Sequence, residues 1–389
     1  MKKHNLKKIF SRVAKRLACL ACSFLKPIAI FKWTGIFPLR EIPFGKISVV
    51  PYKYEEQAPL GMVQPRSISV DAIWTPNPFS RVVMSHMLEI EEGFASCDGY
   101  VFDKIGRLVR QGTHKYRDKI KRAHTLNPHK VFPTIRKYKN EVAIVTASNQ
   151  DFYWHWLFDI LPRLLMLKDV GKNPEKIYIQ KKYPFQFETL GLLGFLSDEQ
   201  IINCDEVPII SASHLIVPCH QIASGREFPN WVGQVLRESF LPLITDKQNV
   251  QNQRIYISRK SARFRRVLNE DEIVDLLKLY GFFVVMLENL AFTEQVDLFR
   301  NAEIVVGASG SGLANLVFCS VGTKVVELFP TSTADANFRL SRSLNLDYYF
   351  LTDPESRLGT WGYDDYVVNN LRIDPKELRE ILHLAGISA

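Results

Sequence analysis

The sequence predicts an α/β fold with two domains, each built on a largely parallel sheet. In residues 254–329, short β-branched or aromatic runs alternate with helical patterns, which is typical of parallel strands joined by crossover helices. A second alternation extends from Val142 to Leu243, and the polar segment Lys247–Gln253 separates the two. A chain of 389 residues with 46% hydrophobic residues is long and apolar enough for two cores.

Basic charge is concentrated at the N-terminus. Residues 1–32 contain nine lysines or arginines and no acidic residue, and the rest of the chain has 41 basic and 41 acidic residues. A neutral body argues against a nucleic-acid-binding protein, which spreads basic charge over a domain face. We therefore expect a basic tail over 1–32, an N-terminal α/β domain over 33–246 and a C-terminal α/β domain over 247–389.

The tail combines its basic residues with an apolar face at helical spacing, formed by Ile9, Val13, Leu17, Leu20 and Phe24. Its longest apolar stretch is too short to cross a bilayer. A basic amphipathic helix on anionic lipid and a solvated leader fit this pattern equally, and a secretory signal fits it less well. Six scattered cysteines favour reduced thiols in the cytoplasm, so peripheral contact with the inner face of the cytoplasmic membrane stays open.

In the N-terminal half, residues 33–95 are rich in proline and show no helical period. A hairpin is expected over Gly99–Val109. A helix over Phe152–Lys168 is expected to be interrupted at Pro162. The other expected elements are strands at Val142–Thr146, Ile177–Gln180 and Leu215–Pro218, and helices at Phe185–Leu193 and Trp231–Leu243.

In the C-terminal half, one helix has Asn269 and Glu272 at the spacing of a capping box and ends at Gly281. Thr293 and Glu294 open the next helix in the same way. The strands of this half are expected at Ile255–Ile257, Phe282–Leu287, Ile304–Val306 and Val325–Leu328, and a last helix at Pro375–Leu384.

A glycine-rich turn, Gly307–Gly312, follows the third of these strands and precedes a helix start. Backbone N–H groups at such a turn, together with the positive end of a helix dipole, bind anions. We therefore predict a site for a phosphate-bearing ligand at Ser309, Gly310, Ser311 and Gly312. Asn315, one turn into the helix, either holds the turn or touches the ligand.

Charged residues at other strand ends extend this prediction. Arg259 and Arg266 follow the first strand of the C-terminal half, and arginine forks fit phosphate oxygens. Glu327 ends the strand after the turn, where a carboxylate either accepts hydrogen bonds from ribose hydroxyls or faces water. We find no Asp-x-Asp after a strand, so we expect no metal ion and no cofactor.

A polar stripe marks the helix after residue 152. His155, Asp159 and Arg163 are spaced to share one helical face, opposite a face of leucines. An imidazole beside a carboxylate is a suitable general base, because the carboxylate orients the ring and stabilises its charged form. The alternative is a structural network of the three side chains that fixes the helix to its domain.

Together these segments resemble glycosyltransferase family 61, whose members are often described as capsular polysaccharide biosynthesis proteins. The resemblance covers roughly residues 140–330 and lies in YWHWLFDILPRL (153–164), ISRKSARFRRVLNEDE (257–272), YGF (280–282), the segment 295–299, GASGSGLANLVF (307–318) and GTKVVELFP (322–330). It implies a GT-B-like architecture of two Rossmann-like domains facing a cleft, and an inverting enzyme that needs no metal. The sugar nucleotide would bind mainly to the C-terminal domain and the glycan acceptor mainly to the N-terminal one.

One position departs from this resemblance, because the family usually has histidine before glycine in the turn, where this chain has Ser309. The resulting hypothesis is an inverting transfer in which His155 is the base, oriented by Asp159, and Arg163 lies on the acceptor side. Arg259, Arg266, the turn residues, Asn315 and Glu327 would hold the donor. The alternative suggested by Ser309 is a non-catalytic glycan- or nucleotide-binding scaffold of a polysaccharide assembly complex.

Overall fold

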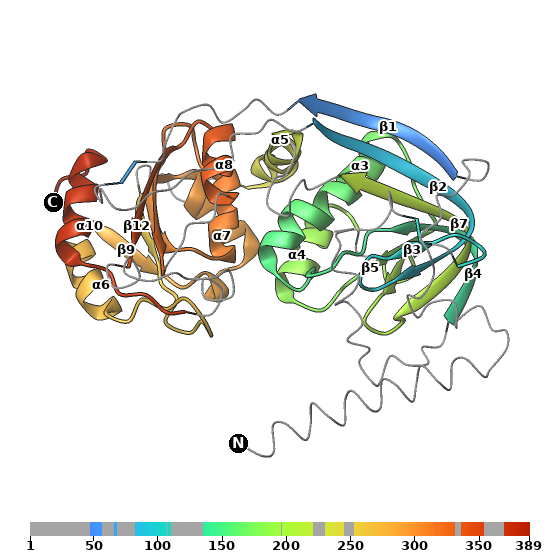
Figure 1. Ribbon diagram of the computed structural model, residues 1–389, viewed down its shortest axis with the longest axis horizontal. Coiled ribbons are helices and arrows are strands. Elements are labelled where there is room, and N and C mark those ends of the chain that lie inside the picture. Colours follow the sequence, from blue (N-terminus) through green and yellow to red (C-terminus); the bar gives the residue numbers. More distant parts are fainter. Residues whose placement is uncertain are drawn as a thin grey trace, which may run out of the picture.

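The protein consists of two α/β halves that lie side by side, each with its own sheet (Figure 1). The computed structural model describes residues 47–56, 66–67, 82–106, 108–109, 135–195, 197–220, 230–244, 253–330, 336–353 and 369–389. The basic tail and nearly all of the predicted linker lie outside these residues. The domain boundaries proposed above therefore stay predictions, whereas the two-domain α/β class is confirmed.

The first sheet has seven strands, and its central part is parallel. Its strands are β1 (Ile47–Glu56), β2 (Val82–Ser96), β7 (Ile209–His220), β4 (Ile135–Ile144), β5 (Lys176–Ile179) and β6 (Ile201–Asn203), in that spatial order, with β3 (Val101–Phe102) paired to β2. The antiparallel strands β1 and β2 form one edge. They fall in the segment expected to be irregular, because buried residues on both faces of β2 remove the alternation that identifies a strand.

The second sheet is entirely parallel and has five strands. Their spatial order is β12 (Asp347–Thr352), β11 (Lys324–Phe329), β10 (Ala302–Ala308), β8 (Gln253–Ile257) and β9 (Phe282–Val285). Four of them lie where the sequence predicted strands, and β12 was not expected. After β8 the chain adds β9 on one side of it and then crosses to add β10 on the other side. The carboxyl ends of β8 and β10 therefore form the topological switch point of the sheet.

Helices cover both faces of this second sheet. The helices α6 (Glu270–Leu279) and α10 (Pro375–Leu384) lie on its outer face, and α7 (Phe292–Arg300) and α8 (Ala336–Ser343) lie on the face toward the first half (Figure 1). The expected capping box at Asn269 does not cap α6, since this side chain instead exchanges two hydrogen bonds with the backbone of Ile373. Glu294 does accept a hydrogen bond from the N–H of Ala291, as a capping carboxylate would.

The predicted helix after residue 152 is confirmed, but it is divided into three parts. They are α2 (Tyr153–His155), a π-helical turn η6 (Trp156–Ile160) and α3 (Leu161–Asp169). Pro162 is the second residue of α3 and closely follows the π turn. The irregularity therefore falls one turn earlier than predicted, between His155 and Pro162. The first half is completed by α4 (Pro184–Leu192), α5 (Asn230–Phe240) and a short 3₁₀ turn, η8 (Leu241–Leu243).

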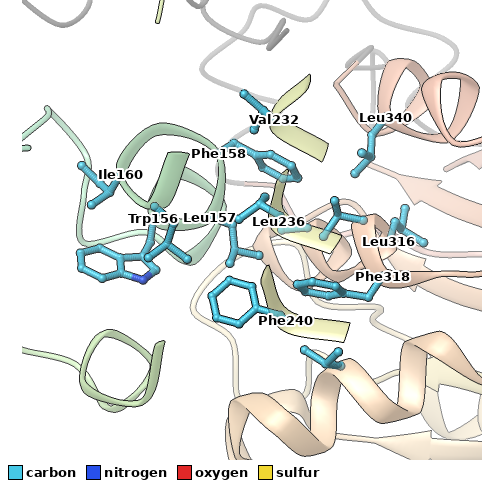
Figure 2. Close-up of a cluster of buried hydrophobic side chains, with 14 of the residues drawn as sticks. Trp156, Leu157, Phe158, Ile160, Val232, Leu236, Phe240, Leu316, Phe318 and Leu340 are labelled. Carbon is cyan, nitrogen blue, oxygen red and sulfur yellow. The ribbon is translucent and has the colours of Figure 1, made fainter. Parts of the chain in front are cut away.

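One buried apolar cluster extends through both halves. Figure 2 shows side chains of α5 between those of η6 on one side and those of the 3₁₀ helix η10 (Ser311–Phe318) and α8 on the other. Phe240 on α5 contacts Phe292 and Phe318, with ring centroids 4.8 and 6.3 Å apart. Separate clusters fill the outer face of each sheet. Within the described residues, no helix is long and apolar enough to cross a membrane.

We expect Phe240→Ala to lower the free energy of unfolding by about 3–5 kcal/mol, because it leaves a cavity where both halves meet. Phe283→Ala is the matched control, since Phe283 is 61% exposed and its truncation should cost less than about 1 kcal/mol. Chemical denaturation followed by fluorescence measures both variants. Equal losses would contradict a shared core at this position.

Candidate active site

The carboxyl ends of β8 and β10 bring together the predicted arginine and the glycine-rich turn. Arg259 lies two residues beyond β8, and Gly310 lies two residues beyond β10. These strands are neighbours in the sheet, so the two positions meet at the switch point, where α/β proteins commonly bind ligands. The sequence prediction that combined Arg259 with the turn is therefore consistent with the geometry.

The Arg259 guanidinium lies against the backbone of Gly310. Its Nε donates to the carbonyl of Arg265 at 3.2 Å and its Nη2 to the carbonyl of Phe264 at 3.0 Å. Any Cβ on Gly310 would overlap Nη1. Glycine is needed here for close approach rather than for its backbone angles, because φ at Gly310 is extended. The loop after β8 thus folds back on Arg259 and holds its guanidinium so that Nη1 lies against the glycine-rich turn.

The turn continues into η10, whose first residues are Ser311 and Gly312. The N–H of Leu313 donates to the carbonyl of Gly310 at 3.1 Å, which closes the first turn of the helix. The amides that precede Leu313 lie at the positive end of the helix, beside the guanidinium of Arg259. This end of the sheet therefore has the donors and the charge to bind an anion.

Ser309 is oriented inward from this turn. It is 2% exposed, its N–H donates to the carbonyl of Leu328 at 2.8 Å, and its hydroxyl hydrogen-bonds to Glu327. The predicted contact between this hydroxyl and a ligand is thus replaced by a contact with the protein.

Glu327 is completely buried, so neither of its predicted roles fits. It accepts hydrogen bonds from Asn337 Nδ2 at 2.8 Å and Tyr348 Oη at 2.5 Å, in addition to Ser309. Burial raises the pKa of this carboxyl, and the three hydrogen bonds and the charge of Arg265 oppose that rise. A ribose or bulk water cannot reach it. The prediction was wrong because a strand-end position does not reveal what covers the strand end.

Asn315 connects the turn to the first half of the molecule. Its amide donates to Gln295 Oε1 at 2.8 Å and to the carbonyl of Gly312 at 3.3 Å. Its Oδ1 accepts a hydrogen bond of 2.6 Å from Tyr153 Oη. Of the two predicted roles, the buried Asn315 has that of holding the turn. Tyr153 and Gln295 were not identified as site residues, since nothing in the sequence pairs either of them with Asn315.

The predicted pair of His155 and Asp159 is present. Asp159 Oδ2 lies 2.7 Å from His155 Nδ1, and the His155 side chain is 19% exposed whereas that of Asp159 is fully buried. A carboxylate at Nδ1 fixes the tautomer in which Nε2 is the basic nitrogen. The imidazole also makes T-shaped contacts with the rings of Phe152 and Trp154, with ring centroids 6.5 and 5.4 Å apart. A π-helical turn at this position is a feature often associated with functional sites.

Arg163 does not belong to an exposed stripe, which corrects its predicted place on the acceptor side. It is 2% exposed, and its Nη1 donates to the carbonyl of Thr146 at 3.2 Å. Burial lowers the pKa of its guanidinium, and the nearby side chains of Cys219 and Asp159 oppose that change. The π turn changes the helical phase, so the predicted i, i+8 relation to His155 does not place both side chains at the surface.

The remaining predicted arginine, Arg266, is exposed, and its backbone pairs with residues 370 and 371. Its neighbour Arg265 adopts a left-handed backbone with φ of 58° and acts on the charge of Glu327. No sequence signal distinguishes Arg265 from the other basic residues of the loop. Among the described residues, no group of three His, Cys, Asp or Glu side chains is arranged to hold a metal ion.

Comparison with known proteins bears on the family resemblance. Residues 153–326 match the model of the family Glycosyltransferase 61, which confirms the resemblance over most of the segment where the motifs indicated it. The match begins at the tyrosine that bonds Asn315 and ends one residue before Glu327.

Three curated relatives are EGF domain-specific O-linked N-acetylglucosamine transferases. The protein of Xenopus laevis is 32% identical over 139 residues, which are 34% of this chain and 26% of the relative. That of Drosophila melanogaster is 33% identical over 96 residues, covering 24% and 18% of the two chains. That of Mus musculus is 30% identical over 100 residues, covering 24% and 19%. The matched region thus spans about a quarter or less of the relatives' length.

We expect Gly310→Ala to weaken the binding of inorganic pyrophosphate about tenfold, because the new methyl group displaces the Arg259 guanidinium. The free energy of unfolding should change by less than about 2 kcal/mol, since only hydrogen bonds of one side chain are lost. Gly233→Ala is the control, because a Cβ there meets nothing closer than 3.8 Å. Titration calorimetry measures both, and undiminished binding in Gly310→Ala would contradict the assignment.

Proposed function

Because residues 153–326 form a glycosyltransferase 61 domain, we propose that the protein transfers a sugar from a nucleoside-diphosphate sugar to a hydroxyl group of an acceptor. The observation that carries this proposal is the hydrogen bond of 2.6 Å between Tyr153 and Asn315. It joins the helix that begins two residues before His155 to the helix that begins at the anion-binding turn. A basic nitrogen and a site for a leaving diphosphate are thereby held in one region of the molecule.

In the proposed reaction, Nε2 of His155 accepts the proton of the acceptor hydroxyl, and the oxygen attacks the anomeric carbon. The new carbon–oxygen bond forms as the bond to the diphosphate breaks, on opposite faces of the sugar, so the configuration inverts. Asp159 stabilises the imidazolium that results. The negative charge on the departing diphosphate is stabilised by Arg259 and by the amides of Gly310, Ser311 and Gly312.

The reaction is proposed to need no metal ion. A divalent ion in such enzymes neutralises the diphosphate, and here a guanidinium already lies at the turn. Arg266 adds a second positive charge at the exposed side of the same loop.

N-acetylglucosamine is the first donor sugar to test, because the curated relatives are named for its transfer. For the acceptor we propose a growing glycan of a capsule, exopolysaccharide or lipopolysaccharide. The support for this acceptor is the resemblance of the motifs to proteins of polysaccharide synthesis.

The second candidate function is a non-catalytic scaffold that binds a glycan or nucleotide. The observation that favours it is Ser309, which stands where the family usually has histidine and which is oriented toward Glu327. A scaffold would bind the nucleotide but neither hydrolyse nor transfer the sugar.

A panel of nucleotide sugars, followed by mass spectrometry, distinguishes the two functions. We expect donor hydrolysis or transfer by the wild type, and a kcat about 10²–10⁴-fold lower for His155→Ala with unchanged nucleotide affinity. Arg259→Ala should lower nucleotide affinity as well. His214→Ala is the control, because His214 pairs with Glu141 at 3.1 Å in the first sheet. Normal turnover by His155→Ala would reject the assigned base, and binding without turnover in the wild type would favour the scaffold.

We also propose that the protein acts in the cytoplasm, where the basic tail contacts anionic lipid at the inner face of the membrane. The support is the concentration of nine basic residues in residues 1–32 beside an apolar face. Deleting residues 1–30 should move the protein from the membrane fraction to the soluble fraction. A full-length variant with Lys2, Lys3, Lys7 and Lys8 changed to glutamine should move in part, and an unchanged distribution of both would contradict lipid contact.

A further inference from the structure

We infer that Glu327 is a positioning residue that fixes both the glycine-rich turn and the basic loop after β8, although it touches no substrate. The inference rests on the proposed function, since it concerns the diphosphate site. In this role the buried carboxylate of Glu327 keeps Gly310 and Arg259 in their relative positions before any ligand binds.

The first route from Glu327 leads to the turn. Its carboxylate accepts the hydroxyl of Ser309, the residue directly before Gly310, and the N–H of Ser309 is held by Leu328 on the same strand as Glu327. Both polar groups of Ser309 are thus fixed to β11. Because Ser309 is fixed in this way, the orientation of the following N–H groups, those of Gly310 and Ser311, is restricted as well.

The second route leads through the basic loop. Arg265 faces Glu327 closely enough to act on its charge, and its carbonyl accepts the Nε hydrogen of Arg259. Arg265 adopts a left-handed conformation that is costly for a residue with a side chain, so surrounding contacts must hold it. Attraction to a buried carboxylate is such a contact. Arg259 packs on Gly310, so the contacts through the turn and the contacts through the basic loop meet at these two residues.

The carboxylate itself is held firmly at the opposite side. Asn337 of α8 and Tyr348 of β12 donate to it at 2.8 and 2.5 Å, and the ring of Tyr348 packs on Phe338 at 5.4 Å between centroids. Glu327 therefore receives hydrogen bonds from α8, from β12 and from the glycine-rich turn.

Energetics favour a positioning role over a merely structural one. A fully buried carboxylate carries a desolvation cost of several kcal/mol, which hydrogen bonds and a nearby cation offset only in part. An apolar residue would fill this strand position at lower cost, as Val325 and Phe329 do on the same face of β11. What the carboxylate adds is a hydrogen bond with Ser309 and electrostatic attraction to Arg265, the two residues that lead to the diphosphate site.

Two variants test the inference in the full-length protein. Ser309→Ala removes the hydroxyl that joins Glu327 to the turn, and Arg265→Gln removes the charge that joins it to the loop. We expect each to weaken UDP binding by about tenfold in titration calorimetry. Thr323→Val is the control: its hydroxyl is also buried and donates to the carbonyl of Ala302, at the other end of the sheet, and its loss should leave UDP affinity within twofold.

Hydrogen exchange gives a readout that needs no ligand. Ser309→Ala should speed exchange in peptides covering 309–313, and Arg265→Gln in peptides covering 259–266, whereas Thr323→Val should change neither. Unchanged exchange in both variants, or equal loss of UDP affinity in the control, would overturn the positioning role while leaving the proposed transfer intact. Absence of binding by the wild type to every nucleoside diphosphate tested would overturn both.

Discussion

A single apolar core joins the two sheets, and the position of every candidate site residue depends on it. Side chains of η6 from the first half, of η10 and α8 from the second, and of α5 between them belong to one cluster (Figure 2). Each fully buried large side chain there contributes about 1.5–3 kcal/mol, so the halves gain strongly from this one arrangement. The helix of His155 and the glycine-rich turn are thereby held together before any ligand is present.

Apolar contacts are not directional, so they alone would not fix how the two halves are oriented relative to each other. Hydrogen bonds inside the core fix this orientation. Tyr153 bonds Asn315 in the middle of η10, and Arg237 of α5 donates to the carbonyls of Val317 and Cys319 at its end, at 2.8 and 2.7 Å. The first half thus fixes η10 at its middle and at its end. A shift of the interface would leave these groups buried without partners, which costs more than the hydrogen bonds themselves contribute.

Sequence patterns predicted the parallel strands well, because strands such as β10 and β11 are short, mostly apolar and rich in β-branched residues, and they alternate with helices. They predicted the pair of His155 and Asp159 and the meeting of Arg259 with the turn, since both follow from local spacing or strand order. They failed for Arg163 and Glu327, whose burial depends on segments distant in the chain. The π turn was equally hidden, because no residue in it breaks a helix.

Buried charged residues, which sequence patterns placed least well, indicate how the site is built. Each half contains a fully buried carboxylate, Asp159 or Glu327, that contacts a residue at the edge of the site. Asp159 orients His155, and Glu327 holds Ser309 and Arg265. Chemistry requires fixed geometry to within a fraction of an ångström, and buried ionic contacts supply direction that packing cannot. The motif residues around a site therefore include residues that hold the site in place as well as residues that contact the ligand. A sequence motif does not distinguish the two, which is why Glu327 was predicted to bind the ligand.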